Sequence, residues 1–411
     1  MDMQPINRPE QTMPGFREFV ALIAALMALN ALAIDAMLPA LPDIGAALGV
    51  ARENDRQLVV SIYMLGLGIG QLFYGPLSDR YGRRAVLLPG ICAYVLFSIV
   101  VSLSGSFDLL LVGRFLQGIA SAATRVLAVS IVRDRYSGRA MARVSSLALM
   151  TFLLVPILAP SIGQAILLVA PWRWIFGVLT IYGLVVLAWA GLRLPETLHP
   201  EYRRPIDLRA IGAGFRTTLT DRQSIGYTLV GGLLSGAIIG YISSVQQIFA
   251  DTLHAPRIFP IVFAIGAAGM AIASLVNARI VERLGMRRVT HAAVIALVLV
   301  NLVHLAIATS GRETVASFAM LQAASMFCIG ISVANVSAMA IEPLARIAGT
   351  AASMQGFVSI VLGSALGGLI AHRFDGTTVP IILGFVTLGV ASVVAILWTE
   401  RGRLFQAHQE G

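Results

Sequence analysis

Two strongly apolar runs are separated by the stretch Gly75-Pro76-Leu77-Ser78-Asp79-Arg80-Tyr81-Gly82-Arg83-Arg84. Gly75 and Gly82 permit a close approach of helices and a sharp turn. The arginines favour the headgroup region on the cytoplasmic side of a membrane. Asp79 is placed to face a helix N-terminus, whose partial positive charge attracts a carboxylate. We therefore predict a tight cytoplasmic loop between two membrane-spanning helices.

The composition of the 411 residues agrees with a membrane location. The chain is 57% hydrophobic and 12% charged, with a mean hydropathy of +0.82, whereas soluble proteins carry about 25% charged residues. This excludes soluble enzymes and disordered chains, and apolar runs of about 20 residues without alternation exclude an outer-membrane barrel. All 30 basic residues are arginine, so the lysine of a P-loop ATPase or a Schiff base is missing. Cys92 and Cys328 both lie in apolar runs, which favours neither a disulfide nor a thiolate metal site.

The apolar runs on both sides of this loop predict an all-α integral membrane protein with twelve transmembrane helices. Each apolar run has about the 20 residues that a spanning helix needs. The first run is too long for the core of a signal peptide and lacks a small-residue cleavage site, so we expect it to be retained. The runs are Phe19–Leu38, Leu58–Leu77, Ala85–Leu103, Leu109–Val132, Val144–Ala170, Trp174–Leu192, Ser224–Ala250, Ile258–Ala278, Val289–Thr309, Thr314–Ile341, Ile347–Ala371 and Val379–Trp398.

The distribution of arginine predicts the orientation. With a cytoplasmic N-terminus, 22 arginines and 12 acidic residues fall on the inner face, for a net charge of +10. The outer face then has 6 arginines and 7 acidic residues, for a net charge of −1. The basic balance is thus a sign of topology and not of nucleic-acid binding. Both termini are expected in the cytoplasm.

An internal repeat divides the chain into two halves. The loop at residues 79–84 is matched, with an offset of 203 residues, by the loop Glu282-Arg283-Leu284-Gly285-Met286-Arg287-Arg288. Two related halves with a site between them are the architecture of secondary transporters. We predict an N-terminal six-helix bundle (1–194), a cytoplasmic linker (195–223) that carries a surface helix, and a C-terminal six-helix bundle (224–411).

The loop at residues 75–84 resembles the signature of the major facilitator superfamily between its second and third helices, G-x-L-S/A-D-R-x-G-R-R/K. The resemblance implies the two-bundle fold of that family. It also implies that the loop acts as a conformational latch between the halves. A simpler interpretation is that the arginines only enforce topology, but this does not explain Asp79 and the two glycines. The implied latch residues are Gly75, Asp79, Arg80, Gly82, Arg83 and Arg84.

Three further motifs narrow the resemblance within the family. The segment Arg114-Phe115-Leu116-Gln117-Gly118 is similar to the superfamily element R-x-x-Q-G. Pro156, Pro160 and Gly163 form a variant of the helix-5 motif of drug antiporters, where prolines bend the helix and small residues let the halves slide. The segment from Asp35 to Pro42 resembles the bicyclomycin-resistance (Bcr/CflA) type of drug:proton antiporter. The two helix-5 prolines are also consistent with a simple kink.

Asp35 and Arg114 are the candidate proton-coupling residues. Asp35 lies 16 residues after Phe19, about 24 Å from the inner end of its helix, and Arg114 lies roughly 22 Å from the inside. Isolated charges in hydrocarbon are costly, so two opposite charges at one depth are expected to pair. A protonatable carboxylate beside a fixed cation suits a proton-coupled exporter. The alternative is a static ion pair that only fixes packing.

Uncharged polar residues are candidates for the substrate cavity, although such residues often serve only as packing contacts between helices. His304 is either a second proton site or a structural histidine. Arg125 either meets an anionic group of the substrate or extends to the inner headgroups. Glu342 is an interfacial carboxylate without an assigned role. The cavity candidates are Asn30, Gln117, Gln246, His304 and Asn335.

Taken together, the motifs predict a proton-coupled antiporter that exports small drug-like or antibiotic molecules across the bacterial inner membrane. Export of a single endogenous metabolite or siderophore is the alternative, and a membrane receptor without transport is a more distant one. No motif indicates an enzyme. We expect a monomer in the lipid bilayer, with a small molecule as substrate, protons as coupling ions, and no other cofactor, metal or nucleic acid.

Overall fold

The computed structural model describes residues 14–136, 138–203, 205–206 and 208–405. These residues form helices and connecting turns, with no strand among them. Eleven of the helices are long and apolar enough to cross a membrane. The remaining predicted run lies in the helix α6 (Gly138–Leu167), which has 30 residues. Its segment Leu154–Leu167 is apolar but shorter than the eleven spans. The chain is therefore an all-helical, multi-pass membrane protein. The outermost parts of both predicted cytoplasmic tails lie outside the described residues.

The helices follow the predicted runs closely. The long helices other than α6 are α1 (Phe16–Asp35), α3 (Leu58–Tyr81), α4 (Arg83–Ser102), α5 (Phe107–Arg135), α7 (Arg173–Arg193), α9 (Arg222–Gln247), α10 (Phe259–Leu284), α11 (Met286–Thr309), α12 (Val315–Ile341), α13 (Ala348–His372) and α14 (Val379–Thr399). The shorter helices are α2 (Leu41–Ala47) and α8 (Leu208–Thr220), with 3-10 turns at Leu38–Ala40, Glu53–Gln57, Pro200–Tyr202 and Glu342–Ile347 and a π turn at Ile248–Thr252.

The first predicted run differs from the structure at its end. The run was expected to continue to Leu38, but α1 ends at Asp35 and a 3-10 turn leads into α2. Pro39 and Pro42 explain the change, because proline has no N–H for a helical hydrogen bond and restricts the residue before it. The second run instead extends beyond its predicted end at Leu77, because α3 continues to Tyr81 with Pro76 inside the helix. Gly82 then ends α3 with a φ of 104°, a conformation that favours glycine.

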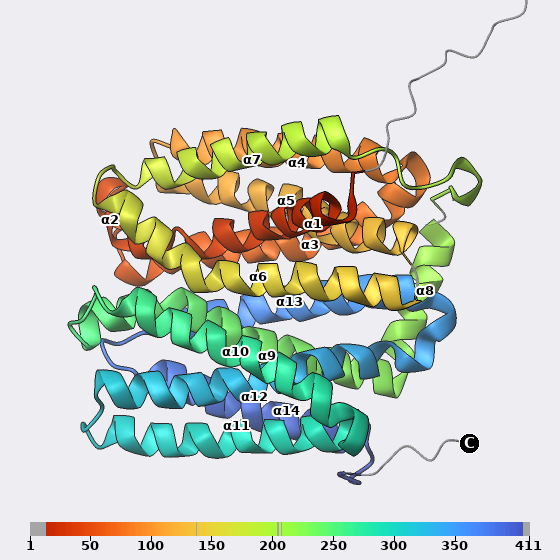
Figure 1. Ribbon diagram of the computed structural model, residues 1–411. Coiled ribbons are helices and arrows are strands. Elements are labelled where there is room, and N and C mark those ends of the chain that lie inside the picture. The colour runs from red at the N-terminus through yellow and green to blue at the C-terminus, as the bar shows by residue number, and fades with distance from the viewer. Residues whose placement is uncertain (1–13, 137, 204, 207, 406–411) are drawn as a thin grey trace, which may run out of the picture.

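Two groups of helices lie side by side in Figure 1. The helices α1 and α3–α7 lie in one group and α9–α14 in the other, and α8 lies at the end of the molecule opposite α2. The groups meet where α3 packs on α13 and α6 packs on α10. A side chain at Gly68 of α3 would lie 3.0 Å from Ile360 and Val361 of α13, so the helices approach closely there. The predicted boundaries 1–194, 195–223 and 224–411 stay a prediction, and α8 lies within the predicted linker.

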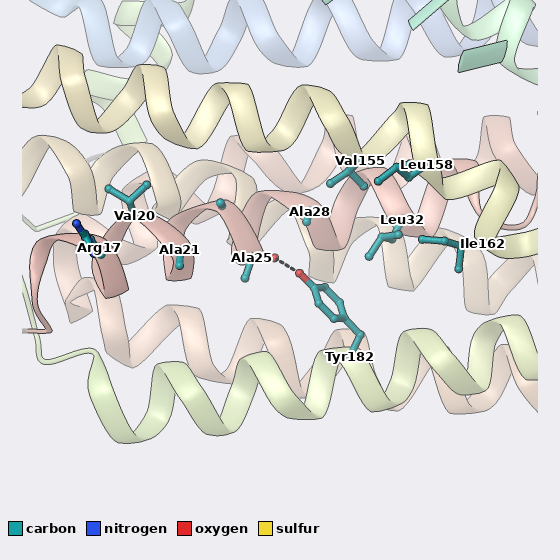
Figure 2. Close-up of a pocket in the computed structure, with 11 residues that line it drawn as sticks. Arg17, Val20, Ala21, Ala25, Ala28, Leu32, Val155, Leu158, Ile162 and Tyr182 are labelled. Carbon is teal, nitrogen blue, oxygen red and sulfur yellow. Dashed lines mark hydrogen bonds between the residues drawn. The ribbon is translucent and has the colours of Figure 1, made fainter. Parts of the chain in front are cut away.

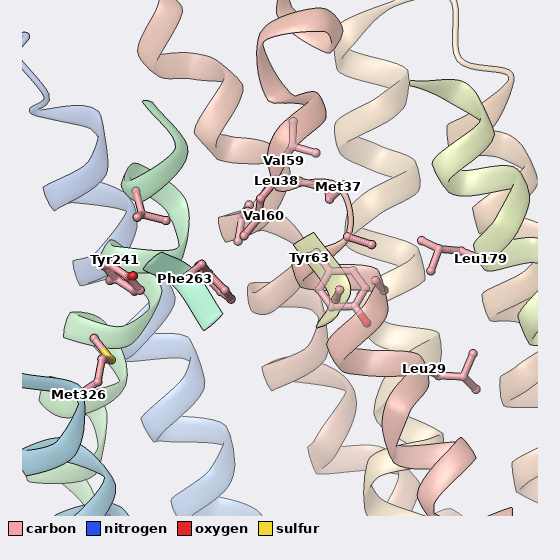
Figure 3. Close-up of a cluster of buried hydrophobic side chains, with 14 of the residues drawn as sticks. Leu29, Met37, Leu38, Val59, Val60, Tyr63, Leu179, Tyr241, Phe263 and Met326 are labelled. Carbon is pink, nitrogen blue, oxygen red and sulfur yellow. The ribbon is translucent and has the colours of Figure 1, made fainter. Parts of the chain in front are cut away.

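Large apolar side chains fill the interior of each group. In the N-terminal group, Leu29, Val60 and Tyr63 are fully buried (Figure 3). In the C-terminal group, the rings of Tyr241 and Phe263 stack with centroids 5.8 Å apart. A polar group buried among these apolar side chains costs free energy unless it is hydrogen-bonded. The polar residues of the interior are therefore the candidates for functional roles.

Candidate functional site

The loop between α3 and α4 is held by a buried arginine. The guanidinium of Arg83 donates to Ser78 Oγ at 2.7 Å and to Asp79 Oδ1 at 2.5 Å. Its Nε donates to Asp134 Oδ2 at 2.8 Å, from the end of α5. The Arg83 side chain is only 4% exposed, whereas that of Asp79 is 45% exposed. Among the described residues, both find their polar partners within the N-terminal half.

The carboxylate at the N-terminus of α4 is Glu196 and not Asp79. Glu196 accepts hydrogen bonds from the backbone N–H groups of Arg83 at 2.7 Å and Arg84 at 3.1 Å. Our expectation that Asp79 takes this position was therefore wrong, because the Asp79 carboxylate is turned to the side chain of Arg83. Sequence reasoning missed Glu196 because it follows Pro195 in the stretch assigned to the linker. Its spacing of 204 residues from Glu400 was the available signal.

The remaining latch residues have different surroundings. Arg84 donates to the carbonyls of Leu194 at 2.7 Å and Gly191 at 2.5 Å, and so joins the loop to the end of α7. Arg80 lies over the ring of Tyr81, with 5.2 Å to its centroid. A side chain at Gly75 would lie 3.7 Å from the Ser353 hydroxyl of α13. Gly75 is therefore the latch residue for which the structure shows a close approach to the C-terminal half.

The matching loop between α10 and α11 has a similar design. Gly285 has a φ of 81° and precedes α11. Arg287 forms an ion pair with Glu400 at 2.9 Å, and a second, longer one with Glu342 at 3.7 Å. Glu342 also accepts a hydrogen bond from Gln223 at 2.7 Å. Glu342, which has no assigned role from the sequence, thus belongs to this loop network.

Arg114 lies in the interior of the N-terminal half with no exposed surface. Its Nε donates to the Val59 carbonyl at 3.1 Å and its Nη1 to Gln117 Oε1 at 2.7 Å. The guanidinium also lies 4.3 Å from the centroid of the Tyr63 ring. Gln117 in turn donates to Ser98 Oγ at 2.6 Å. Gln117 therefore connects α5 to α4 and does not lie free in a cavity.

Asp35 and Arg114 do not form the ion pair that we expected. Asp35 is 4% exposed, and its Oδ1 has no hydrogen-bond partner among the described residues. Asn30 of α1 faces α5, where its amide donates to Thr124 at 2.9 Å. Asp35 is five residues later and so lies about 140° around the helix from Asn30. Equal depth is insufficient to predict a pair, because it does not fix the direction of a side chain.

Asn30 belongs to a polar chain with Tyr63 and Ser121. The Tyr63 hydroxyl donates to Ser121 Oγ at 2.8 Å, and Asn30 Nδ2 reaches the Ser121 carbonyl at 3.3 Å. The chain thus joins α1, α3 and α5, and the guanidinium of Arg114 lies over the ring of Tyr63. Tyr63 had not been singled out from the sequence, where it is one aromatic residue among many in an apolar run. Arg125, one turn after Ser121 on α5, is exposed and has no hydrogen bond or ion pair with a described residue.

Three cavity candidates lie in the C-terminal half, and two of them have partners there. His304 is fully buried, and its Nε2 lies 2.7 Å from Glu313 Oε1, while Glu313 also accepts from Thr378. Asn335 exchanges two amide hydrogen bonds with Asn277, at 3.0 and 2.9 Å. These residues therefore join helices within one half.

Gln246 is the third of these candidates, near the end of α9. It is buried, and its Oε1 has no hydrogen-bond partner among the described residues. The five cavity candidates thus do not form one cluster: Asn30 and Gln117 belong to N-terminal networks, His304 and Asn335 to separate C-terminal contacts.

The predicted helix-5 motif lies on α6. Pro156 and Pro160 are inside this helix, which continues without interruption from Gly138 to Leu167. A side chain at Gly163 would collide with the Ala36 carbonyl directly after α1. Gly163 is thus required for the close contact of α6 with the end of α1, next to Asp35. The hinge role of the two prolines stays a prediction.

A group of polar contacts joins the two halves at the α2 end of the molecule. We call it the polar clamp; the sequence does not predict it, because its residues lie at helix ends and in turns that are far apart in the chain. Arg56 pairs with Asp251 at 3.1 Å, and Gln247 donates to Asn54 at 3.1 Å. Its further contacts are those of Gln57 with Gln247, of Asn54 with the carbonyls of His372 and Phe374, and of Asp55 with His372.

Two bundles of apolar helices, with buried charges inside and a polar contact between them at one end, define a membrane transport protein. The model of the Major Facilitator Superfamily matches residues 23–360. The chain belongs to this family, and it is a transporter rather than an enzyme. The resemblance seen at the loop of residues 75–84 is thereby confirmed.

Similar bacterial proteins cover almost the whole chain. An uncharacterized MFS-type transporter, YdgK of Bacillus subtilis, is 32% identical over 376 residues, covering 90% of this chain and 93% of its own. A bicyclomycin resistance protein homolog of Haemophilus influenzae is 27% identical and covers 92% and 94%. The multidrug resistance protein MdtL of Escherichia coli O157:H7 is 27% identical and covers 95% and 98%. These relatives are consistent with a drug-efflux type of transporter.

Two solved structures show the same fold. The human organic anion transporter MFSD10 (TETRAN) has a TM-score of 0.70 at 19% identity, covering 94% of this chain and 100% of its own. A D-xylose-proton symporter has a TM-score of 0.74 at 14% identity and covers 94% and 97%. At these identities the likeness concerns the fold alone.

Proposed function

We propose that the protein is a proton-coupled antiporter that exports small drug-like molecules across the bacterial inner membrane. In this proposal α6 is the twelfth span, and the arginine distribution places both termini in the cytoplasm. The names of the bicyclomycin and multidrug relatives support the substrate class. Transport proceeds by alternating access, with the two bundles opening in turn to either side, and the protein acts as a monomer without metal or organic cofactor.

The observation that carries the proposal is the buried carboxylate of Asp35. An ionisable residue within a membrane-spanning helix is costly and marks a functional path for ions or protons. Asp35 has an oxygen without a partner among the described residues, so no fixed counter-charge holds it in one protonation state. Its neighbour α6 carries Gly163 and the two prolines, and this helix also touches α10 of the other half. A change of charge at Asp35 therefore occurs next to a helix that contacts both halves.

The polar clamp suggests which state of the cycle the structure represents. With the proposed orientation, the clamp lies on the periplasmic side and closes that side. Asp79 and Arg83, which the family resemblance assigns to the latch on the cytoplasmic side, have their partners within the N-terminal half. We assign the structure to the inward-facing part of the cycle, with the latch disengaged and the clamp formed.

The test compares two aspartates of the same half. Asp35→Asn should abolish resistance to a panel of antibiotics in a host that lacks its own efflux pumps, since the amide carries no proton. Asp108→Asn changes an exposed residue near the start of α5 and should leave resistance unchanged. Substrate-induced proton release from the detergent-solubilised protein should be lost only in Asp35→Asn.

The outcomes separate the possible functions. Wild-type proton release by Asp35→Asn would overturn the assigned coupling role. Wild-type protein that protects against no compound of the panel, but depletes one metabolite from the cells, would replace drug export by export of that metabolite.

A further inference from the structure

A groove along the outside of the N-terminal half has no role in the proposed transport cycle. It has a volume of about 460 Å³, within the range of about 300–1,000 Å³ of ligand pockets. One side of α1 forms its floor, α6 forms one wall, and α7 contributes Tyr182 (Figure 2). The exposed apolar residues Ile181 and Val185 of α7 indicate that this surface faces lipid.

The floor of the groove is low because alanines follow one another along one face of α1. Ala21, Ala25, Ala28 and Leu32 are spaced by three or four residues, which places them on one side of a helix. The wall on α6 is higher, since Leu158 and Ile162 are exposed by 55% and 41%. The result is a groove with an apolar lining along α1.

Two polar residues line the groove, Tyr182 near its middle and Arg17 at one end (Figure 2). The Tyr182 hydroxyl donates to the Ala25 carbonyl at 3.1 Å and is therefore already satisfied (Figure 2). Arg17 is exposed at the end where α1 begins, and it has no hydrogen bond or ion pair with a described residue. The nearest acidic residue on the helix, Glu18, is engaged by Arg193 at 2.7 and 2.8 Å. Glu18 thus does not neutralise Arg17.

A second cation strengthens the positive charge at this end. The guanidinium of Arg143 lies 5.1 Å from the centroid of the Phe16 ring, next to Arg17 in sequence. Arg193 and Glu18 cancel each other, so among the described residues Arg17 and Arg143 leave a net positive charge beside the apolar groove. An amphiphile with an anionic head and a long apolar tail fits this arrangement.

The length of the groove points to an acyl chain. From Arg17 to Leu32 the helix rises about 22 Å, more than the half-thickness of about 15 Å of a bilayer core. An acyl chain that starts at the headgroup level would therefore lie in the groove over its full depth in one leaflet. The other ligand class, a free apolar substrate, would form no interaction with Arg17, which has no ion pair within residues 14–136, 138–203, 205–206 and 208–405.

We propose that this groove binds one acyl chain of an anionic phospholipid and that Arg17 holds its phosphate. The assignment to the cytoplasmic leaflet rests on the orientation given with the proposed function. The binding itself does not depend on that orientation or on transport, because the groove and Arg17 lie within one half of the molecule.

The experiment titrates the full-length protein in mild detergent with phosphatidylglycerol or phosphatidylethanolamine and counts bound lipids by native mass spectrometry. The wild type should bind its first phosphatidylglycerol about fivefold more tightly than phosphatidylethanolamine, as expected for one arginine at an anionic headgroup. Arg17→Gln should remove this preference. The double variant Ala21→Leu with Ala25→Leu should fill the groove and weaken the first binding event for both lipids.

Arg279→Gln provides the matched control, because Arg279 is an exposed arginine near the end of α10 and does not line the groove. This variant should keep the fivefold preference. The proposal is overturned if Arg17→Gln keeps the preference, if Arg279→Gln loses it equally, or if the two leucines leave binding unchanged. Since no transport is measured, failure here is distinct from a failure of the proposed antiport.

Discussion

The two matched loops, one in each half of the chain, share a common frame but differ at three positions, where Asp79, Tyr81 and Arg83 are matched by Glu282, Leu284 and Met286. In both, a glycine with positive φ precedes the next helix, at Gly82 and Gly285. In both, a glutamate 204 residues from its counterpart contacts the loop, Glu196 in one and Glu400 in the other. The offset of 203 residues places Met286 opposite Arg83.

The difference shows which part of the loop is structural and which part is special to the N-terminal half. The glycine and glutamate fasten each loop to the last helix of its own bundle, so they serve the packing of both halves. Arg83, Asp79 and Asp134 form an additional charged network that the C-terminal loop lacks at the corresponding methionine. We therefore expect the conformational role to lie in this network.

The largest effect is expected when the N-terminal loop is made like its counterpart. Arg83→Met removes a nearly buried charge and leaves Asp134 and Asp79 without their cation. Loss of a buried charged partner typically costs about 3–5 kcal/mol, and the exposure of Asp79 reduces this to about 2–3 kcal/mol. The melting temperature in detergent should fall clearly, and Met286→Leu should leave it nearly unchanged. Equal melting temperatures of Arg83→Met and wild type would contradict the comparison.

The two glycines give a smaller and sharper contrast. Both Gly82→Ala and Gly285→Ala place a side chain on an extended backbone with positive φ, which costs roughly 1–3 kcal/mol. At Gly82 the new methyl group would also collide with the Glu196 carboxylate, whereas at Gly285 nothing lies within 4 Å. Thermal unfolding should therefore show the greater loss for Gly82→Ala. If Gly285→Ala is the more damaging variant, the two loops are not built as described.

The shared glutamates are expected to have similar effects. Glu196→Gln weakens the interaction with the N-terminus of α4, and Glu400→Gln weakens the ion pair with Arg287. Each is expected to cost about 1 kcal/mol. Paired measurements of thermal unfolding test this, with Glu201→Gln, an exposed residue after α7, as control. A tenfold difference between the two in the unfolding equilibrium would show that the frame is not shared.

The smallest effect on stability is expected for Asp79→Asn, because Asp79 is half exposed and its ion pair is screened by solvent. The populations of the inward-facing and outward-facing states should nevertheless change, while substrate affinity within one state stays nearly the same. Distances between spin labels at the two ends of the bundles measure this. Glu282→Gln, the corresponding change in the C-terminal loop, should leave the populations unchanged. A shift of the same size in both variants would remove the special status of the N-terminal loop.

Hydropathy and the loop motif were sufficient to predict the helices and the family, because a spanning helix must be apolar over about 20 residues wherever it occurs. The side-chain partners were less predictable. The pairing of Asp35 with Arg114 failed because depth leaves the direction around a helix undetermined. The role of Glu196 was not predicted, because a carboxylate in a loop that binds a helix N-terminus leaves no periodic pattern in the sequence. The partners of His304 and the polar clamp depend on which distant loops meet in space, and no local pattern contains that information.

The polar clamp has a consequence for the mutational robustness of the protein. Its contacts are several separate hydrogen bonds and ion pairs, each worth about 1 kcal/mol net. Since 1.4 kcal/mol corresponds to about a tenfold change in rate, losing any one contact accelerates opening less than about tenfold. A substitution that removes one contact therefore leaves most of the clamp formed, whereas a substitution of Asn54, which takes part in three of the contacts, has a larger effect. The positions that make one contact are thus free to vary in sequence while the timing of opening is retained, so related transporters can diverge at these positions without losing their cycle.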